Sequence, residues 1–164
     1  MINLREESQE VFYTDESVLN ISISDIDILK KKMASSNKNR IRLCTHKTKE
    51  DLLHEMVIIH TDKCYVRPHK HVNKIESITV LEGEAKIIIF NDNGSVFKEF
   101  MVGGYNDGFF FYHRMNIEKY HMFIIQSKFF VFHEVTRGPF DKKHTMFPDW
   151  APEEYDQDFI NKFT

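Results

Sequence analysis

Between residue 40 and about residue 136, short apolar runs alternate with turn signals at regular intervals. Runs of this length, rich in Ile, Val, Phe and Tyr and separated by Gly, Asn and Asp, are typical of β-strands. The pattern predicts a mainly β chain that folds as a β-sandwich or a small β-barrel. The strands that we expect are Glu55–His60, Tyr65–His71, Ser77–Leu81, Ala85–Phe90, Val96–Val102, Gly108–Tyr112, His121–Gln126 and Phe129–Val135.

One long segment with helical periodicity precedes this region. Ile26, Leu29 and Met33 recur three and four residues apart, which places them on one face of a helix. Ser24 has the side chain of an N-terminal cap, and we expect Asp27, as the third helical residue, to complete it. The polar stretch at residues 34–39 should end the helix.

The length fits a single domain with three parts. A chain of 164 residues leaves no room for two domains of ordinary size. We expect an N-terminal extension with the helix packed on the barrel (1–39), the barrel itself (40–137) and a C-terminal tail (138–164). Prolines at 139, 148 and 152 interrupt any strand in the tail. It should wrap the barrel and end in a short helix near residues 153–162.

Composition excludes several classes of protein. The formal net charge of −3 and the pI near 6.3 argue against a general nucleic-acid binder. Cys44 and Cys64 lack the spacing of a zinc finger, and we expect two buried, reduced thiols. The first residues carry acids and no apolar run, and no stretch approaches the ~20 apolar residues of a membrane span. These features predict a cytoplasmic protein.

The segment from Pro68 to Glu76 is the richest in metal-binding side chains. His69 and His71 would share one face of a strand, so their imidazoles can reach one ion. Glu76 follows after a short loop, and Gly83 closes the turn after the next strand. His121 opens a later apolar strand and supplies a fourth ligand. We therefore expect one divalent transition metal bound by His69, His71, Glu76 and His121.

Ligand type leaves the identity of the metal open. Three imidazoles and a carboxylate suit iron, manganese, zinc, nickel, cobalt or copper as divalent ions. Four protein ligands leave one or two positions free for water or substrate on an ion that accepts five or six.

His69-x-His71-x4-Glu76-x6-Gly83 resembles the first cupin motif, and His121 resembles the metal-binding histidine of the second. From about residue 24 to 155 the chain is similar to the WbuC family of cupin-fold metalloproteins. The matching runs are RIRLCTH (40–46), YVRPHKH (65–71) with Lys74 and Glu76, FNDNG (90–94), GPF (138–140) and WAPEE (150–154).

The resemblance implies a double-stranded β-helix with one metal. It also implies a place in bacterial clusters for O-antigen or other surface polysaccharides, and it makes a homodimer plausible. It brings no settled reaction. One departure concerns the second motif, whose usual Pro-x-Gly is missing before His121, so that His113 is a rival ligand. We prefer His121 because an apolar alternating strand follows it directly.

Four residues near the motif are candidates for binding substrate: Arg67, Tyr65, Lys74 and Arg42. Strand alternation would place Tyr65 and Arg67 on the face of the histidine ligands, where an arginine requires an anion. Arg67 would then bind a carboxylate or phosphate of the ligand, or pair with an acidic side chain at the barrel mouth. Lys74 lies in a loop and is expected to face solvent. Arg42 could belong to a basic group that closes over one end of the pocket, or lie in an exposed loop. The remaining histidines are not expected to bind the metal; they are His54, His60, His133 and His144.

Two classes of function follow. The first is a metal-dependent enzyme acting on a small polar metabolite, such as a sugar or sugar-nucleotide intermediate, as an isomerase or epimerase. Tyr65 or Lys74 would move the proton while the metal polarises a carbonyl. An Fe(II)-dependent dioxygenase is a variant of this class. The second is a non-catalytic, metal-assisted binding or accessory protein, and a third possibility is a metal that only stabilises the barrel.

Overall fold

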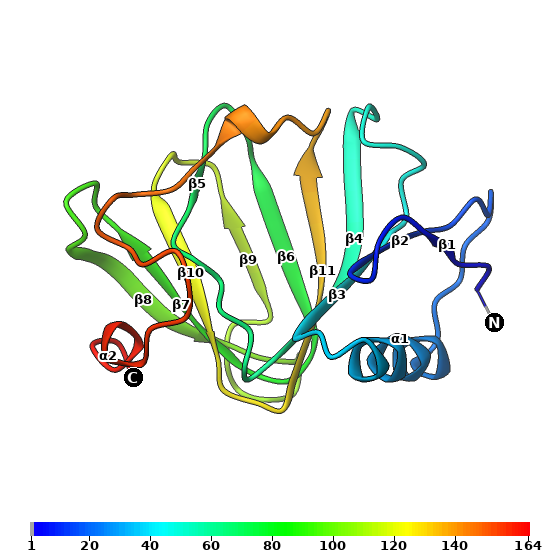
Figure 1. Cartoon of the computed structure of the whole chain (residues 1–164), viewed down its shortest axis with the longest axis horizontal. Helices are drawn as coiled ribbons and strands as arrows, with labels where there is room; N and C mark the ends of the chain where they lie inside the picture. The colour runs from blue at the N-terminus through cyan, green and yellow to red at the C-terminus, as the bar shows by residue number, and fades with distance from the viewer. Residues whose placement is uncertain (1) are drawn as a thin grey trace.

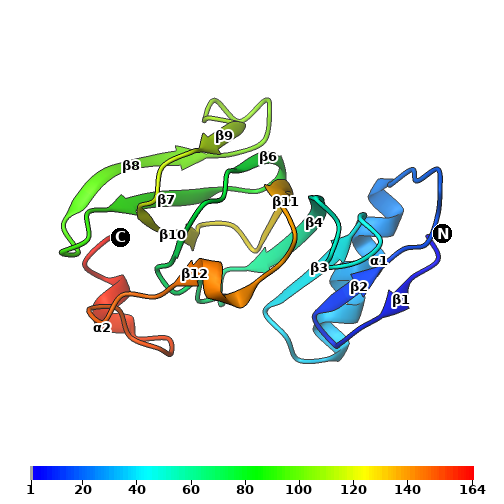
Figure 2. The same ribbon diagram turned by 90° about the horizontal axis from the view of Figure 1, so that it is seen from above.

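Two β-sheets face each other across the main core in the computed structural model, which describes residues 2–164 (Figures 1 and 2). The larger has seven strands in the order β1-β2-β3-β4-β11-β6-β9, and the smaller has three in the order β10-β7-β8. The strands of the larger sheet are β1 (Arg5–Glu6), β2 (Val11–Tyr13), β3 (Arg40–Cys44), β4 (Leu53–Thr61), β6 (Glu76–Glu82), β9 (Tyr112–Met115) and β11 (Phe129–Arg137). The smaller sheet comprises β7 (Ala85–Phe90), β8 (Val96–Val102) and β10 (Tyr120–Ile125). The predicted mainly β fold is confirmed.

The two sheets do not close into a continuous barrel. Within residues 2–164, no ladder joins β8 to β9; a single bridge between Val102 and Phe110 links that side. A further two-stranded sheet pairs β5 (Lys70–His71) with β12 (Thr145–Met146). Every strand pair is antiparallel except β2 with β3.

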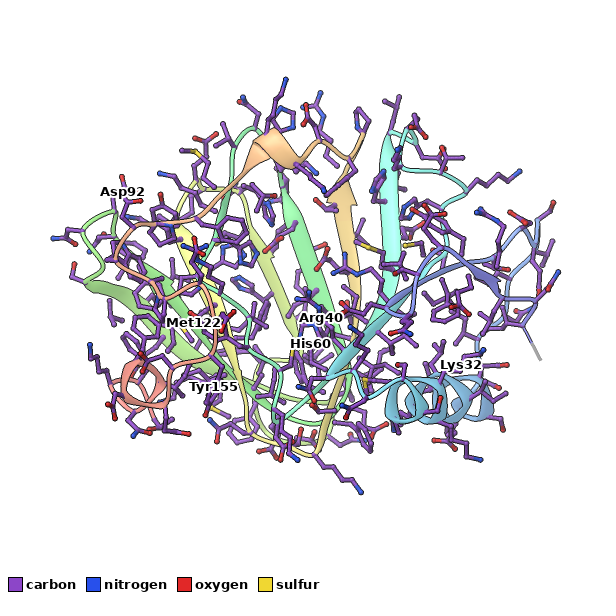
Figure 3. The ribbon with its side chains drawn as sticks, viewed as in Figure 1. Lys32, Arg40, His60, Asp92, Met122 and Tyr155 are labelled. Atoms are coloured by element: carbon purple, nitrogen blue, oxygen red, sulfur yellow. The ribbon has the colours of Figure 1, made fainter. Side chains whose placement is uncertain are left out.

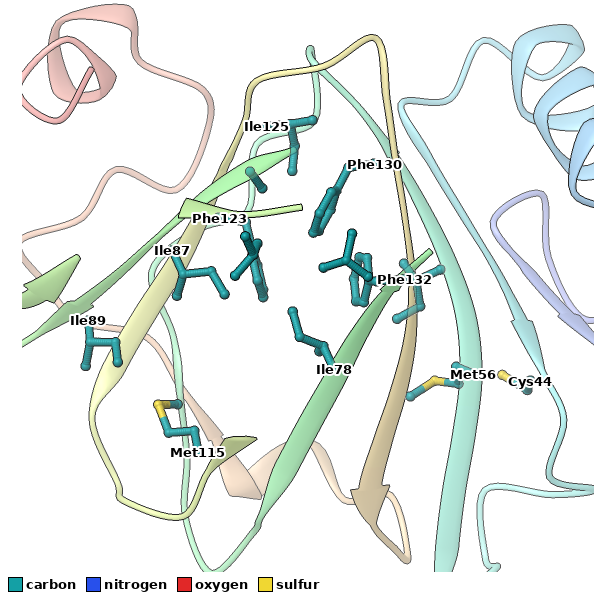
Figure 4. Packing of buried hydrophobic residues seen from close by; sticks show 14 residues of the cluster. Cys44, Met56, Ile78, Ile87, Ile89, Met115, Phe123, Ile125, Phe130 and Phe132 are labelled. Atoms are coloured by element: carbon teal, nitrogen blue, oxygen red, sulfur yellow. The ribbon is translucent and has the colours of Figure 1, made fainter. Parts of the chain in front are cut away.

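The main core fills the space between the two sheets (Figure 4). Alternate residues of β6, such as Ile78 and Val80, point inward, as the two-residue period of a strand requires. Phe123 of β10 packs against Phe132 of β11 with ring centroids 5.8 Å apart, which joins the two sheets by a large apolar contact.

The helix α1 (Ile23–Ser35) packs on the outer face of the larger sheet. Its buried side chains are Ile26, Leu29 and Met33, as predicted. The predicted cap at Ser24 is wrong: Ser22 caps the helix, and its backbone N–H donates to Asp25, which completes a capping box. The Ser22–Asp25 pair has the same spacing as Ser24–Asp27, and the earlier pair forms the reciprocal bonds.

The strand predictions hold for most of the chain. Ala85–Phe90 and Val96–Val102 match in full, and four others differ only at their ends. The prediction of a strand over Tyr65–His71 is wrong, because only Lys70–His71 joins a ladder. The prediction at Gly108–Tyr112 is also wrong. The Asp107 carboxylate accepts a bond from Gly104 N and holds a turn there, and the strand begins at Tyr112.

The C-terminal segment covers the outer face of the smaller sheet. After the short helix η1 (Lys142–His144) and β12, the chain crosses β7 and β10 and ends in α2 (Gln157–Ile160). Trp150, Phe159 and Ile160 pack against Phe90 and other apolar side chains of the two strands. The two chain termini lie at opposite ends of the molecule (Figure 2). No helix in the described part of the chain is both long and apolar enough to cross a membrane.

Candidate metal centre

Three histidines converge beside the main core. One ring nitrogen from each of His69, His71 and His121 lies within 4.8 Å of the others, so the group could hold a metal ion. His69 and His121 are joined through their backbones, with N···O distances of 3.1 and 2.9 Å in the two directions. This bridge sets the two imidazoles next to each other, with ring centroids 4.4 Å apart.

The second nitrogen of each ring is held by a neighbouring oxygen. The Nδ1 atom of His69 lies 2.8 Å from the Arg67 carbonyl, and that of His121 lies 3.2 Å from the Lys119 carbonyl. Because a carbonyl only accepts, both Nδ1 atoms carry a proton, which leaves Nε2 as the atom that can bind a metal. The Nδ1 atom of His71 is 3.2 Å from Thr145 Oγ1. This is the usual arrangement of histidines that bind a metal through Nε2.

The Nε2 atom of His121 is buried and lacks a well-aligned hydrogen bond. It is fully shielded from solvent, and within residues 2–164 its close polar neighbour is the Glu76 carboxylate, whose Oε1 is 3.0 Å away without a well-aligned hydrogen bond. A buried polar atom without a well-aligned partner is costly, and a cation at this position would satisfy its lone pair. The donor set therefore fits a divalent transition metal.

Glu76 brings a carboxylate to the same place. It is the first residue of β6 and is buried. Its Oε1 lies 3.0 Å from His121 Nε2, and its Oε2 lies 3.3 Å from His71 Nε2. The Glu76 carboxylate therefore faces the Nε2 atoms of His121 and His71.

Burial and local charge control protonation at the centre. Burial, reinforced by the charges of His121 and His71, lowers the pKa of His69 to about 3 and keeps its imidazole neutral. Burial alone would raise the pKa of Glu76, but His121 and His71 hold it well below 4.5. Burial likewise opposes the charge on His121, yet Glu76 raises its pKa. Binding of a metal to His121 would therefore release a proton.

His113, the rival to His121, lies outside the histidine group. It is on β9 opposite Ile78, and its ring packs 5.0 Å from that of Phe100. Burial lowers its pKa. Among the residues that the structure describes, the three-histidine group contains His121 and not His113.

Tyr65 and Arg67 contact the C-terminal segment. The Tyr65 hydroxyl donates to the Pro152 carbonyl at 2.9 Å, and burial raises its pKa to about 12. The Arg67 guanidinium lies 3.6 Å from the Glu153 carboxylate and 4.8 Å from the centre of the Phe147 ring. Strand alternation does not apply to Tyr65 and Arg67, because residues 65–68 do not form a strand. Arg67 instead has an acidic partner, which was the alternative expectation.

Glu134 is a second inward-facing carboxylate, and it is not among the residues predicted from the sequence. It stands on β11 directly opposite Met56 on one side and Ile78 on the other, and both belong to the main core. Burial, together with the negative charge of Glu76, raises its pKa to about 7. The signal was available in the sequence, since Glu134 follows Phe130 and Phe132 at strand spacing.

Arg42 and Lys74 lie near Glu134. Arg42 belongs to β3 and faces the core side of the sheet, opposite Ile58. Lys74 lies in the loop before β6, partly buried, with its Nζ 5.5 Å from the centre of the Phe140 ring. Both positive charges act to lower the pKa of Glu134, against the effect of burial. Lys74 and Arg42 thus lie near Glu134 and the candidate centre, and Arg67 reaches the centre through its backbone carbonyl, which accepts from His69 Nδ1.

Four of the remaining histidines lie apart from the centre. The rings of His46 and His54 stack on each other at 4.0 Å, and His60 packs edge-on against Phe132 at 5.5 Å. His133 pairs loosely with Glu55 at 3.7 Å. Figure 3 labels His60 and Arg40, which are cross-strand partners on β4 and β3.

Comparison with protein-family models finds one match, over residues 21–102, to a family described as a domain of unknown function, DUF6016. The match spans half of the chain. This chain belongs to the DUF6016 family. A search of curated proteins finds no match to it.

Solved structures similar to this DUF6016 chain have the cupin fold. The capsular polysaccharide assembling protein CapF from Staphylococcus aureus is 20% identical with a TM-score of 0.57, over 67% of this chain and 32% of CapF. CapF with the inhibitor 3-isopropenyl-tropolone is 21% identical with a TM-score of 0.55, over 65% and 31%. A structural-genomics protein from Shewanella oneidensis is 8% identical with a TM-score of 0.50, over 63% and 66%.

The DUF6016 chain spans about a third of the length of CapF. At these identities the likeness concerns the fold. The fold class is that of the cupins, as the sequence predicted.

Proposed function

We propose that this DUF6016 chain is a metal-dependent cupin enzyme related to the WbuC family. It binds one divalent transition metal through His69, His71, His121 and Glu76. It acts as an isomerase or epimerase on a small polar metabolite, such as a sugar or sugar-nucleotide intermediate of bacterial surface polysaccharide (O-antigen) biosynthesis. The observation that carries the proposal is the convergence of three imidazoles whose Nδ1 atoms are held by oxygens, with the Nε2 atoms of His71 and His121 facing the Glu76 carboxylate.

Glu134 favours an enzyme over a binding module. A catalytic site needs a titratable group besides the metal ligands, whereas a site that only binds does not. Glu134 is such a group, because it faces the same interior as Glu76 from the neighbouring strand. Its pKa of about 7 suits a group that both takes up and returns a proton near neutral pH.

In an isomerisation, each of these residues would have a separate role. A bound divalent ion would act as a Lewis acid and polarise a carbonyl oxygen of the substrate. Glu134 Oε would take a proton from the carbon next to that carbonyl and return it to the neighbouring position or the opposite face. Arg42 and Lys74 would stabilise the carboxylate form of Glu134 while it acts as the base.

Other observations support the proposed pathway, compartment and oligomeric state. The structural likeness to CapF supports a role in polysaccharide assembly, and CapF's own activity is a property of a protein three times as long. Cys44 and Cys64 are free thiols, which accords with a reducing cytoplasm. The resemblance to WbuC supports a homodimer.

Metal analysis tests the centre. Protein purified without chelator and without an affinity nickel column should contain about one transition metal per chain. His69→Ala and His121→Ala should lose it, and His133→Ala, which lies outside the group, should keep it. Metal at the wild-type level in both His69→Ala and His121→Ala would refute the site.

Solvent isotope exchange tests the reaction. Metal-loaded protein is incubated with keto-sugar nucleotides in D₂O, and ¹H NMR follows exchange of the carbon-bound hydrogen next to the carbonyl. Exchange that disappears in Glu134→Gln, with metal content unchanged, supports the proposal. Oxygen consumption with oxidised products would indicate the Fe(II) dioxygenase instead. Saturable binding with neither exchange nor oxidation would indicate the non-catalytic protein.

A further inference from the structure

A small cavity lies beside the candidate metal centre, between the loop before β6 and the segment that follows β11. Its volume is about 170 Å³, several times the ~30 Å³ that a water molecule occupies in the liquid. There is room for a tetrahedral oxyanion. The lining residues are Asn73, Lys74, Arg137, Gly138, Pro139 and His144.

The lining is cationic. Lys74, Arg137 and His144 supply nitrogen donors, and no acidic residue lines the cavity. In residues 2–164, neither Lys74 nor Arg137 makes a side-chain ion pair within 4.0 Å.

Lys74 is a partly buried ammonium without a close counter-charge. An ammonium group in such a half-buried position loses part of its hydration. The Phe140 ring, 5.5 Å from Nζ, offers the ammonium group a cation–π contact in place of part of its hydration. An anion in the cavity would replace the lost hydration with a direct charge-assisted hydrogen bond.

Backbone bonds fix both walls of the cavity. Val72 N donates to the His144 carbonyl at 2.8 Å, and Arg137 N donates to the Ile75 carbonyl at 3.3 Å. Asn73 has a left-handed backbone (φ 57°), and its N–H donates to the Glu118 carboxylate at 2.8 Å. A cavity whose walls are already held in place costs little ordering when a ligand enters it.

The cavity adjoins the metal centre through both of its walls. Lys74 lies between the candidate ligands His71 and Glu76 in the sequence, so the loop that carries it starts and ends at the centre. On the other wall, Thr145 follows His144 directly and contacts His71 Nδ1. A ligand with one end at the metal could therefore place a second group in the cavity.

We infer that this cavity is a subsite for a phosphoryl group of the substrate, bound by Lys74, Arg137 and His144. The inference rests on the proposed function, because it assumes that the other end of the substrate reacts at the metal centre. It adds the class of substrate: a phosphorylated metabolite, such as a sugar phosphate or sugar nucleotide. Three nitrogen-bearing side chains suit a dianionic phosphoryl group better than a monoanionic carboxylate.

Inorganic phosphate is the probe. Titration calorimetry of the metal-loaded protein should show saturable phosphate binding that weakens as salt is raised. Lys74→Gln and Arg137→Gln should each weaken it by about tenfold or more, as loss of a charge-assisted bond requires. Lys128→Gln, at an exposed position in the loop before β11, is the matched control and should bind phosphate as wild type does.

Further measurements distinguish a failure of this inference from a failure of the proposed function. The metal content of Lys74→Gln and Arg137→Gln should equal that of wild type, and phosphate should also bind the metal-free protein. If no metal binds but phosphate does, with the same sensitivity to the two variants, the subsite stands and the proposed function fails. Phosphate binding that ignores both substitutions, acetate binding as tight as phosphate binding, or no saturable binding would each overturn the subsite.

Discussion

Thr145 Oγ1 lies 3.2 Å from His71 Nδ1, so a residue 74 positions along the chain holds one of the candidate metal ligands in place. Thr145 reaches His71 because β12 pairs with β5, with Thr145 directly opposite His71. The C-terminal segment is therefore part of the candidate centre.

Thr145→Val should weaken metal binding by about 10- to 100-fold, the usual effect of removing the hydrogen-bond partner of a ligating histidine. Valine has nearly the shape of threonine and lacks the hydroxyl. Thr145→Ser keeps the hydroxyl and should restore most of the affinity. Competition with a fluorescent chelator measures both constants. Equal affinity in wild type and Thr145→Val would show that the contact does not support the ligand.

Glu134→Gln should stabilise the metal-free protein at alkaline pH. Because folding raises the pKa of Glu134 from 4.5 to about 7, its favourable contribution is complete below pH 4.5 and is lost as pH rises through 7. The variant should gain on the order of 3 kcal/mol above pH 7 and almost nothing at pH 4. Urea unfolding at several pH values measures this. Glu99→Gln, at an exposed position on β8, should show no such trend; a gain independent of pH in Glu134→Gln would contradict the assignment.

His60→Leu should make the protein more resistant to acid. Burial, with the charges of Arg42 and Arg40, lowers the pKa of His60 from 6.5 to about 3. Stability is therefore lost as pH falls below 6.5, by up to about 1.4 kcal/mol per pH unit for this one group. Removing the imidazole should flatten the dependence between pH 6 and pH 4, as measured by chemical unfolding. His133→Leu is the comparison, and an unchanged slope in His60→Leu would refute the prediction.

Tyr65→Phe should change stability and leave the metal centre intact. The variant loses the hydrogen bond to the Pro152 carbonyl, at a cost of about 1 kcal/mol in the free energy of unfolding. Metal content and isotope exchange should match wild type, because the phenol contacts the tail. Tyr105→Phe, with a 77% exposed side chain, is the control for stability. A loss of exchange at full metal content would return Tyr65 to the catalytic candidates.

Removal of the metal should leave the fold in place. Three clusters of buried apolar side chains hold the sheets, helices and tail together, and none of them includes a candidate ligand. Chelated protein should keep its far-ultraviolet circular dichroism. Its free energy of unfolding should fall by the linkage amount, about 2.7 kcal/mol for metal at 100 times Kd. Unfolding on chelation would instead show that the metal serves mainly to stabilise the barrel.

The local pattern of apolar and polar residues was enough to predict many of the strands and the helix. The two-residue alternation located most of the strands, and the spacing of Ile26, Leu29 and Met33 located the buried face of α1. His69, His71 and Glu76 lie close together in the sequence, so a short turn is enough to bring them together. Such a motif can be predicted from the sequence because the backbone geometry of a few residues determines where its side chains point.

The sequence by itself determined which side chains alternate within each strand and which residue types could bind a metal. Only the tertiary structure decided that Thr145 supports His71, that Glu134 shares an interior with Arg42 and Lys74, and that Tyr65 and Arg67 contact the tail. The physical reason is that alternation is a local property of the backbone. Which faces meet, and which loop covers them, depends on how distant segments bury their apolar surface together.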